Sequence, residues 1–175
     1  MNLVLIGYRG SGKTTVGRLM AADHEAGFID TDELIVHQAG QSIAEVFADE
    51  GELGFRKREA EAIRLATAGK ERVISVGGGA VESAANRKAL RGYGTVVWLE
   101  APAEVLWRRI REDANSVKQR PDLAGGGLDE VREVLARRAP LYAETAHCVV
   151  RVADRTPRQG VADIEQWLAL GNALG

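Results

Sequence analysis

The sequence predicts a single α/β domain, with a parallel β-sheet covered by helices on both faces. Three observations lead to this prediction. Short apolar runs alternate with longer amphipathic segments along the 175 residues, and this alternation is typical of parallel sheets. A glycine-rich phosphate-binding motif directly follows the first apolar run. The length suits one hydrophobic core, and no stretch has the composition of a linker, repeat or low-complexity tail.

The first predicted strand covers residues 3–6 and leads into Gly-Tyr-Arg-Gly-Ser-Gly-Lys-Thr at 7–14, a complete G-x-x-x-x-G-K-[ST] loop. Its position between a strand and a helix distinguishes it from a chance glycine-rich turn. The glycines allow backbone N–H groups to point at phosphates. Lys13 can reach the β- and γ-phosphates, and the Thr14 hydroxyl can hold Mg²⁺. The residues expected to bind ATP here are Gly10, Ser11, Gly12, Lys13, Thr14 and Thr15.

The second predicted strand, residues 27–30, ends in Asp30-Thr31-Asp32. Ligands of parallel sheets gather at the carboxyl ends of the strands. One carboxylate, Asp30, can therefore face Mg²⁺, while Asp32 reaches a second substrate. An aspartate here can also cap the following helix. Because two acids are present, the two interpretations are compatible.

A helical region is expected over about residues 31–68, with interruptions near Gly40 and Gly51. Arg56 within it can be an ordinary solvated charge on a helix. The third predicted strand, residues 73–76, ends in the triplet at 77–79. These three glycines can form a loose turn, or they can let the backbone approach a ligand closely.

The fourth predicted strand covers residues 95–99, and Pro102 suits the first turn of the next helix. A polar, glycine-rich stretch at 113–127 then separates two helical patterns. It is longer than most connections, which predicts a loop that opens and closes. The last strand, residues 148–152, leads into a C-terminal helix expected to end near Leu170.

Composition narrows the classes of function. A net charge of −2 argues against nucleic acid or an anionic membrane as the main partner, and no apolar run is long enough to span a bilayer. A core strand beginning at Leu3 leaves no room for a signal peptide. The single cysteine, Cys148, predicts a buried thiol in a reducing cytoplasm. The three histidines lack metal-ligand spacing, so the expected metal is Mg²⁺ arriving with ATP. Oligomeric state has no sequence signal, and a monomer is the expectation.

Together these motifs resemble the shikimate kinase family over nearly the whole chain. The matching segments are GSGKTTVG at 10–17, FIDTD at 28–32, GQSI at 40–43, Phe55-Arg56 with Glu59, GGGAV at 77–81 and RAPLY at 138–142. The resemblance implies a three-layer P-loop NTPase-type fold, similar to nucleoside monophosphate kinases. It also implies one domain over 1–175, a substrate-binding helical region at about 31–68 and a mobile lid at about 113–127.

The implied activity is ATP-dependent phosphorylation of the 3-hydroxyl of shikimate. The products are shikimate 3-phosphate and ADP, in the pathway to chorismate and the aromatic amino acids. Mg²⁺ would be held by Thr14 and Asp30. Asp32 would accept hydrogen bonds from shikimate hydroxyls and serve as the base. Lys13 would act as a second catalytic residue through its positive charge.

The resemblance also implies which residues bind the substrate carboxylate and which arginines contact ATP. Arg56 and Arg138 would grip the carboxylate, with backbone contacts from Gly77, Gly78 and Gly79. Such guanidinium forks suit carboxylates. Arg120 would reach ATP and the transferring phosphate from the lid, and Arg155 or Arg158 would lie near the adenine.

The lid sequence departs from the family pattern, in which the lid arginine precedes Pro and two apolar residues. Here the run is Arg120-Pro121-Asp122-Leu123, and Asp122 brings a negative charge close to the expected path of ATP. Arg109, before the lid, is the next candidate for a nucleotide-side arginine, with Arg108 and Arg111 as close alternatives.

Two other functions remain open. A related kinase of another small hydroxy acid, such as gluconate, or of a nucleoside monophosphate would share the loop but would not need the pair Arg56 and Arg138. A non-catalytic nucleotide-binding homologue would not need the intact set of catalytic residue types found here, which are Lys13, Thr14, Asp30 and Asp32.

Overall fold

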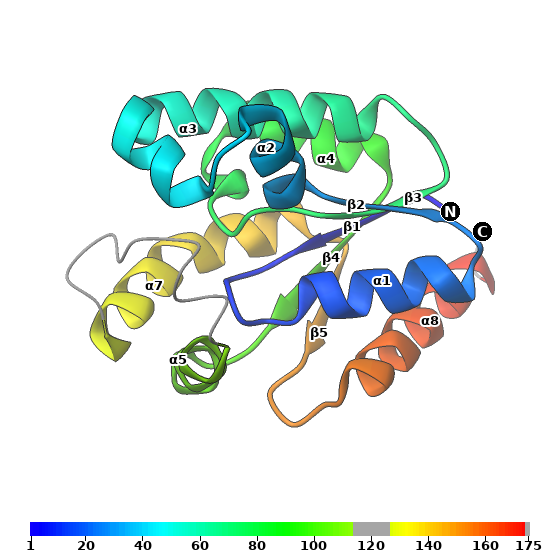
Figure 1. The fold of residues 1–175 in the computed structure, drawn as a ribbon. Helices are drawn as coiled ribbons and strands as arrows, with labels where there is room; N and C mark the ends of the chain where they lie inside the picture. The colour runs from blue at the N-terminus through cyan, green and yellow to red at the C-terminus, as the bar shows by residue number, and fades with distance from the viewer. Residues whose placement is uncertain (114–126, 174–175) are drawn as a thin grey trace.

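The computed structural model describes residues 1–113 and 127–173, the last three by their backbone alone. Five parallel strands form one sheet in the order β2-β3-β1-β4-β5 (Figure 1). The strands are β1 (Leu3–Ile6), β2 (Gly27–Asp30), β3 (Arg72–Ser75), β4 (Thr95–Glu100) and β5 (Cys148–Arg151). The sequence located every one of them, with ends that differ by no more than one residue.

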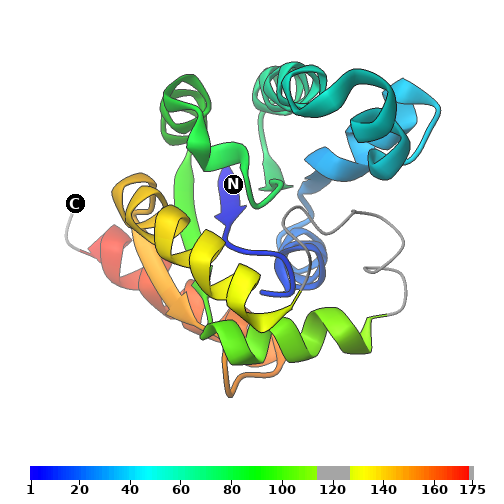
Figure 2. The same cartoon turned by 90° about the vertical axis from the view of Figure 1, so that its left-hand side faces the viewer.

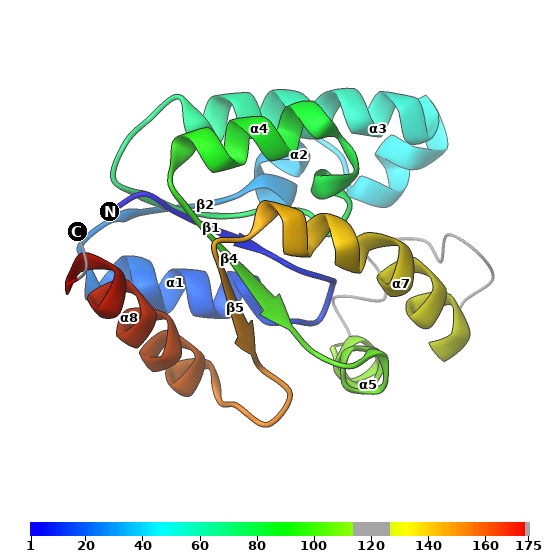
Figure 3. The same ribbon diagram turned by 180° about the vertical axis from the view of Figure 1, so that it is seen from behind.

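Helices cover both faces of the sheet. They are α1 (Lys13–Asp23), α2 (Thr31–Ala39), α3 (Ile43–Thr67), the 3₁₀ helix η1 (Ala80–Glu82), α4 (Ala84–Tyr93), α5 (Ala103–Glu112), α7 (Leu128–Thr145) and α8 (Pro157–Ala173). Figures 1 and 3 show α1 and α8 on one face and α3 and α4 on the other. The predicted three-layer α/β fold is confirmed. The C-terminal helix runs to Ala173, three residues beyond the expected end, because a glycine such as Gly171 weakens a helix without ending it.

The core explains why the strands are continuous apolar runs. Leu3 and Leu5 pack with α1 and α8, whereas Val4 and Ile6 pack with the second half of α3, with α4 and with α7. All four are fully buried. Successive strand side chains point to opposite faces, so a strand covered on both sides needs apolar residues at every position.

The α2–α3 pair forms a smaller cluster of its own. Figure 2 shows α2 beside the first half of α3, and Phe47 and Phe55 stack there with ring centroids 4.4 Å apart. Both predicted interruptions are confirmed: Gly40 ends α2 at φ 66°, and Gly51 breaks α3 at φ 68°. These left-handed angles suit glycine. The break at Gly51 sets the direction of the α3 segment that carries Arg56.

The register brings the strand ends to one level. Asp30 at the end of β2 pairs with Ser75 of β3, which pairs in turn with Leu5 of β1. The segments that follow these strands therefore leave the sheet at the same edge.

The predicted lid lies almost entirely in residues 114–126, outside the described part of the chain. Arg120 and Asp122 belong to that segment, so their roles stay predictions. Among the described helices, none is both long and apolar enough to cross a membrane.

Candidate active site

The loop after β1 has the conformation that its glycines predict. Gly7, Gly10 and Gly12 have φ of 141°, 81° and 88°, angles that side-chain-bearing residues rarely adopt. Gly12 caps α1, which begins at Lys13. The Lys13 ammonium folds back over the loop and donates to the carbonyl oxygens of Gly7 (2.9 Å) and Tyr8 (3.0 Å). A cation, a helix N-terminus and a curled backbone thus meet at one place, which suits a chain of phosphates.

Asp30 caps α2, which is one of the two roles that the sequence left open for the acidic pair. Its Oδ1 accepts hydrogen bonds from the N–H groups of Asp32 (3.0 Å) and Glu33 (3.4 Å), which caps α2. Its Oδ2 accepts the hydroxyl of Thr14 at 2.8 Å. One carboxylate therefore connects the phosphate loop with the start of α2, and Asp32 is not needed for the cap.

A cavity of about 250 Å³ opens where the three strand ends meet. Its lining includes Lys13, Thr14, Asp30, Asp32 and Gly78. The predicted convergence of the phosphate loop, the acidic pair and the glycine triplet is confirmed. Thr31 joins two of these segments, because its Oγ1 accepts the N–H of Gly77 at 3.2 Å and its side chain is fully buried.

Arg56 is held on α3 by a buried acid. Its Nη1 donates to Oε2 of Glu59 at 2.8 Å, and the Glu59 side chain is 1% exposed. Burial alone would lower the pKa of Arg56, but the charge of Glu59, with those of Glu82 and Glu52, raises it above its ordinary value. Arg56 is thus a fixed, permanent cation. It also lies directly against Gly79: a Cβ at that glycine would come within 2.7 Å of Nη2.

Arg138 approaches Arg56 from α7, and both contact the same carboxylate. The buried Arg138 donates from Nε to Oε1 of Glu82 at 2.9 Å, and Arg56 donates from Nη2 to Oε2 of Glu82 at 3.1 Å. The structure therefore brings the two predicted carboxylate-binding arginines to one anionic group. That group belongs to the chain itself, and no pattern in the sequence pointed to it.

Tyr142, the last residue of the RAPLY segment, also contacts the site. It stands one helical turn after Arg138 on α7, so both side chains face the site. Its hydroxyl donates to the carbonyl oxygen of Gly78 at 2.6 Å in a fully buried position, and burial raises the pKa of the phenol. Tyr142 thus fixes the glycine triplet. The spacing between Arg138 and Tyr142 is the sequence signal for this role.

A further cavity of about 230 Å³ lies on the other side of the phosphate loop. Arg109, Arg155 and Pro157 are among its lining residues, with Gly12 and Thr15 from the loop. Arg109 donates from Nη2 to the carbonyl oxygens of Val152 (2.7 Å) and Ala153 (3.2 Å), which fixes α5 to the segment after β5.

The structure separates the two C-terminal arginines that the sequence could not distinguish. Arg155 lines this cavity and pairs with Asp163 at 3.0 Å. Arg158 pairs instead with Asp23, at the end of α1, at 2.5 Å and is not among the lining residues.

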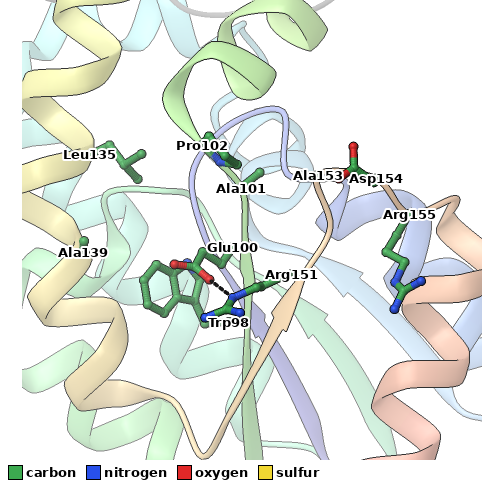
Figure 4. A pocket seen from close by; sticks show the side chains of 10 residues that line it. All are labelled: Trp98, Glu100, Ala101, Pro102, Leu135, Ala139, Arg151, Ala153, Asp154 and Arg155. Carbon is green, nitrogen blue, oxygen red and sulfur yellow. Dashed lines mark hydrogen bonds and ion pairs between the residues drawn. The ribbon is translucent and has the colours of Figure 1, made fainter.

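A larger cavity, of about 580 Å³, lies between α7 and the ends of β4 and β5. Figure 4 shows Trp98 beside the ion pair of Glu100 and Arg151, with Arg155 turned away toward α8. No residue of the phosphate loop and neither Arg56 nor Arg138 lines it. The phosphate loop and the acidic pair line the smaller, polar cavity instead, and Arg56 and Arg138 line neither of the two.

The chain is similar to known proteins in sequence and in fold over nearly its whole length. The family model for shikimate kinase matches residues 9–169. A shikimate kinase of Symbiobacterium thermophilum is 46% identical over 169 residues, which are 96% of each chain. The solved shikimate kinase of Acinetobacter baumannii in complex with shikimate has a TM-score of 0.91 at 38% identity, over 99% of this chain and 95% of that one. The shikimate kinase structure from Aquifex aeolicus has a TM-score of 0.85 at 34% identity, over 100% and 99%.

Proposed function

The chain belongs to the shikimate kinase family, and we propose that it transfers the γ-phosphoryl group of ATP to the 3-hydroxyl of shikimate, in the pathway to chorismate and the aromatic amino acids. One observation carries this proposal. A phosphate loop and a pair of arginines that already hold a carboxylate lie at the same edge of the sheet, where Arg138 lies over the ring of Tyr8 in the loop. A kinase of an anionic hydroxy acid needs both.

In this proposal the phosphate loop positions ATP. Loop N–H groups and the N-terminus of α1 bind the phosphates, and Lys13 places its charge where negative charge develops during transfer. Thr14 and Asp30 provide a hydroxyl and a carboxylate 2.8 Å apart, an oxygen set that fits Mg²⁺ when phosphates complete its shell. Bound there, Mg²⁺ would neutralise charge on the β- and γ-phosphates.

Asp32 acts on the other substrate. It lines the same cavity as Lys13 and Gly78, so a hydroxyl held by its carboxylate would lie next to the phosphates. As the oxygen of that hydroxyl forms its bond to phosphorus and the bond to the β-phosphate oxygen breaks, Asp32 accepts the proton. Positioning supplies most of the acceleration in such transfers.

Arg56 and Arg138 bind the shikimate carboxylate, with the backbone of Gly77, Gly78 and Gly79 beside it. The α2–α3 region at about 31–68 serves as the substrate-binding part of one domain. On the nucleotide side we propose that Arg109 and Arg155 lie at the adenine, because both line the second cavity. Arg158 is the less favoured candidate, since it pairs with Asp23 instead.

We also propose a monomeric cytoplasmic enzyme that needs no nucleic acid or membrane partner. The buried thiol of Cys148, whose pKa burial raises, is compatible with that setting.

Replacing Arg138 with Lys should weaken shikimate binding by about ten- to a hundredfold, because the charge stays but the planar fork and its hydrogen bonds are lost. ATP binding without shikimate should hardly change. Steady-state KM values for both substrates measure this. Arg132→Lys, an exposed arginine of the same helix that pairs with Glu104, is the matched control and should leave both KM values within about twofold. If the Arg138→Lys enzyme had a raised ATP KM and an unaltered shikimate KM, Arg138 would bind ATP and not shikimate, which would contradict the proposal.

The substrate assignment is tested by ADP release from MgATP with shikimate, gluconate or AMP as acceptor. Of the three acceptors, we expect only shikimate to raise ADP release above the background rate of ATP hydrolysis. A clear preference for gluconate or AMP would favour the related kinases that share the phosphate loop, and no acceptor-dependent release would favour a nucleotide-binding homologue.

A further inference from the structure

Glu82 occupies the place where the proposed function puts the substrate carboxylate. It is the last residue of η1, shortly after the glycine triplet. Its two carboxylate oxygens are shared between Arg138 (2.9 Å, to Oε1) and Arg56 (3.1 Å, to Oε2). Arg137 lies 3.4 Å from Oε1. A bound acid would present the same chemical group to the same two guanidinium groups.

Glu82 is charged in this position. Burial opposes its ionisation, but the hydrogen bond and charge of Arg138, with the charges of Arg56 and Arg137, outweigh that effect and lower the pKa of the carboxyl group. A second carboxylate arriving at Arg56 and Arg138 would therefore meet a like charge. Two carboxylates that share one site repel each other, which disfavours the doubly ionised arrangement.

Each of the two arginines also has a contact other than Glu82. Arg56 is already held by Glu59, which is buried within α3. Arg138 is 6% exposed and lies over the ring of Tyr8, 6.0 Å from its centroid. The Glu82 side chain is 25% exposed, against 1% for Glu59, so Glu82 borders solvent and can leave. Arg137 is 61% exposed, so it can remain an ion-pair partner of the Glu82 carboxylate after that side chain turns toward solvent.

We propose that Glu82 is an internal competitor of the substrate carboxylate: it neutralises Arg56 and Arg138 in the free enzyme, must leave them when shikimate binds, and so sets the affinity for the acid. This inference rests on the proposed function. It makes Glu82 a determinant of substrate affinity that never touches the reacting atoms. A positioning role would have the opposite effect on affinity, because removal of a supporting carboxylate would loosen the arginines.

The test compares Glu82→Gln and Glu82→Ala with the wild-type enzyme. We expect the shikimate KM, and the Kd from calorimetric titration without nucleotide, to fall by about three- to tenfold in both variants. The kcat and the ATP KM should stay within about twofold. Glu144→Gln is the matched control. Glu144 is an exposed carboxylate of α7 near Arg87, so its replacement removes the same charge without freeing Arg56 or Arg138, and the shikimate KM should be unchanged.

The methyl ester of shikimate separates competition from a general effect. It lacks the charge for which Glu82 competes, so its affinity should gain less than that of the acid when Glu82 is replaced. An equal gain for ester and acid would overturn the inference, as would an unchanged or raised shikimate KM in the Glu82 variants of an active enzyme. Failure of the proposed function is recognised separately: the wild-type enzyme would then release no ADP in response to shikimate.

Discussion

Replacement of Lys13 with Ala should abolish phosphoryl transfer, with a loss in kcat of about a thousandfold or more. The ammonium lies over the phosphate loop on the carbonyl oxygens of Gly7 and Tyr8, where it can follow the charge that develops on the transferring group. The left-handed backbone angles of the loop lie at its glycines, which the replacement leaves in place. The fold should therefore persist, as checked by circular dichroism and the melting temperature.

Lys13→Met keeps the aliphatic stem and should lose activity to a similar extent, which separates the charge from the packing of the side chain. Lys88→Ala, an exposed lysine of α4, is the control for loss of a positive charge and should keep kcat within about twofold. Near-normal turnover by a folded Lys13→Ala protein would contradict the role given to the loop.

Replacement of Asp32 with Asn should lower kcat by about a hundred- to ten-thousandfold, the range associated with a positioned base. The amide can still hydrogen-bond to a substrate hydroxyl but cannot accept its proton. Shikimate KM should change far less than kcat. The cap of α2 is formed by Asp30, so stability should be nearly unaffected.

Glu33→Gln provides the neighbouring control for Asp32. Glu33 belongs to the same first turn of α2 but pairs with the exposed Arg18, and its replacement should leave kcat within about twofold. If Asp32→Asn instead raised the shikimate KM with kcat intact, Asp32 would bind the hydroxyls without serving as the base.

Local patterns explain how much of this molecule the sequence could predict. The strand runs, the breaks at Gly40 and Gly51, and the phosphate loop depend on neighbouring residues, and their predicted positions agree with the structure within a few residues. The meeting of three strand ends followed from a general property of parallel sheets. Asp30 was harder, because the sequence offered both helix capping and a ligand contact for the acidic pair. Only the fold shows that Asp30 forms the cap and also accepts the hydroxyl of Thr14.

The contacts of Glu82 could not be predicted in the same way. They join residues 26 and 56 positions apart, and they depend on where η1 and α7 come to lie in the folded chain. No motif marks position 82. A buried partner such as Glu59 could at least be expected from its helical spacing to Arg56, since residues three apart are neighbours on a helix.

The most direct measurement is the identity of the phosphorylated product. Enzyme, MgATP and shikimate are incubated, and the reaction is followed by phosphorus-31 NMR with proton coupling. We predict that ADP and shikimate 3-phosphate appear in equal amounts, with the new phosphorus coupled to the proton on carbon 3, and that neither forms with Lys13→Ala. ADP with inorganic phosphate in place of a phosphorylated acid, or a phosphate on a different hydroxyl, would contradict the proposed arrangement of ATP, Asp32 and the paired arginines.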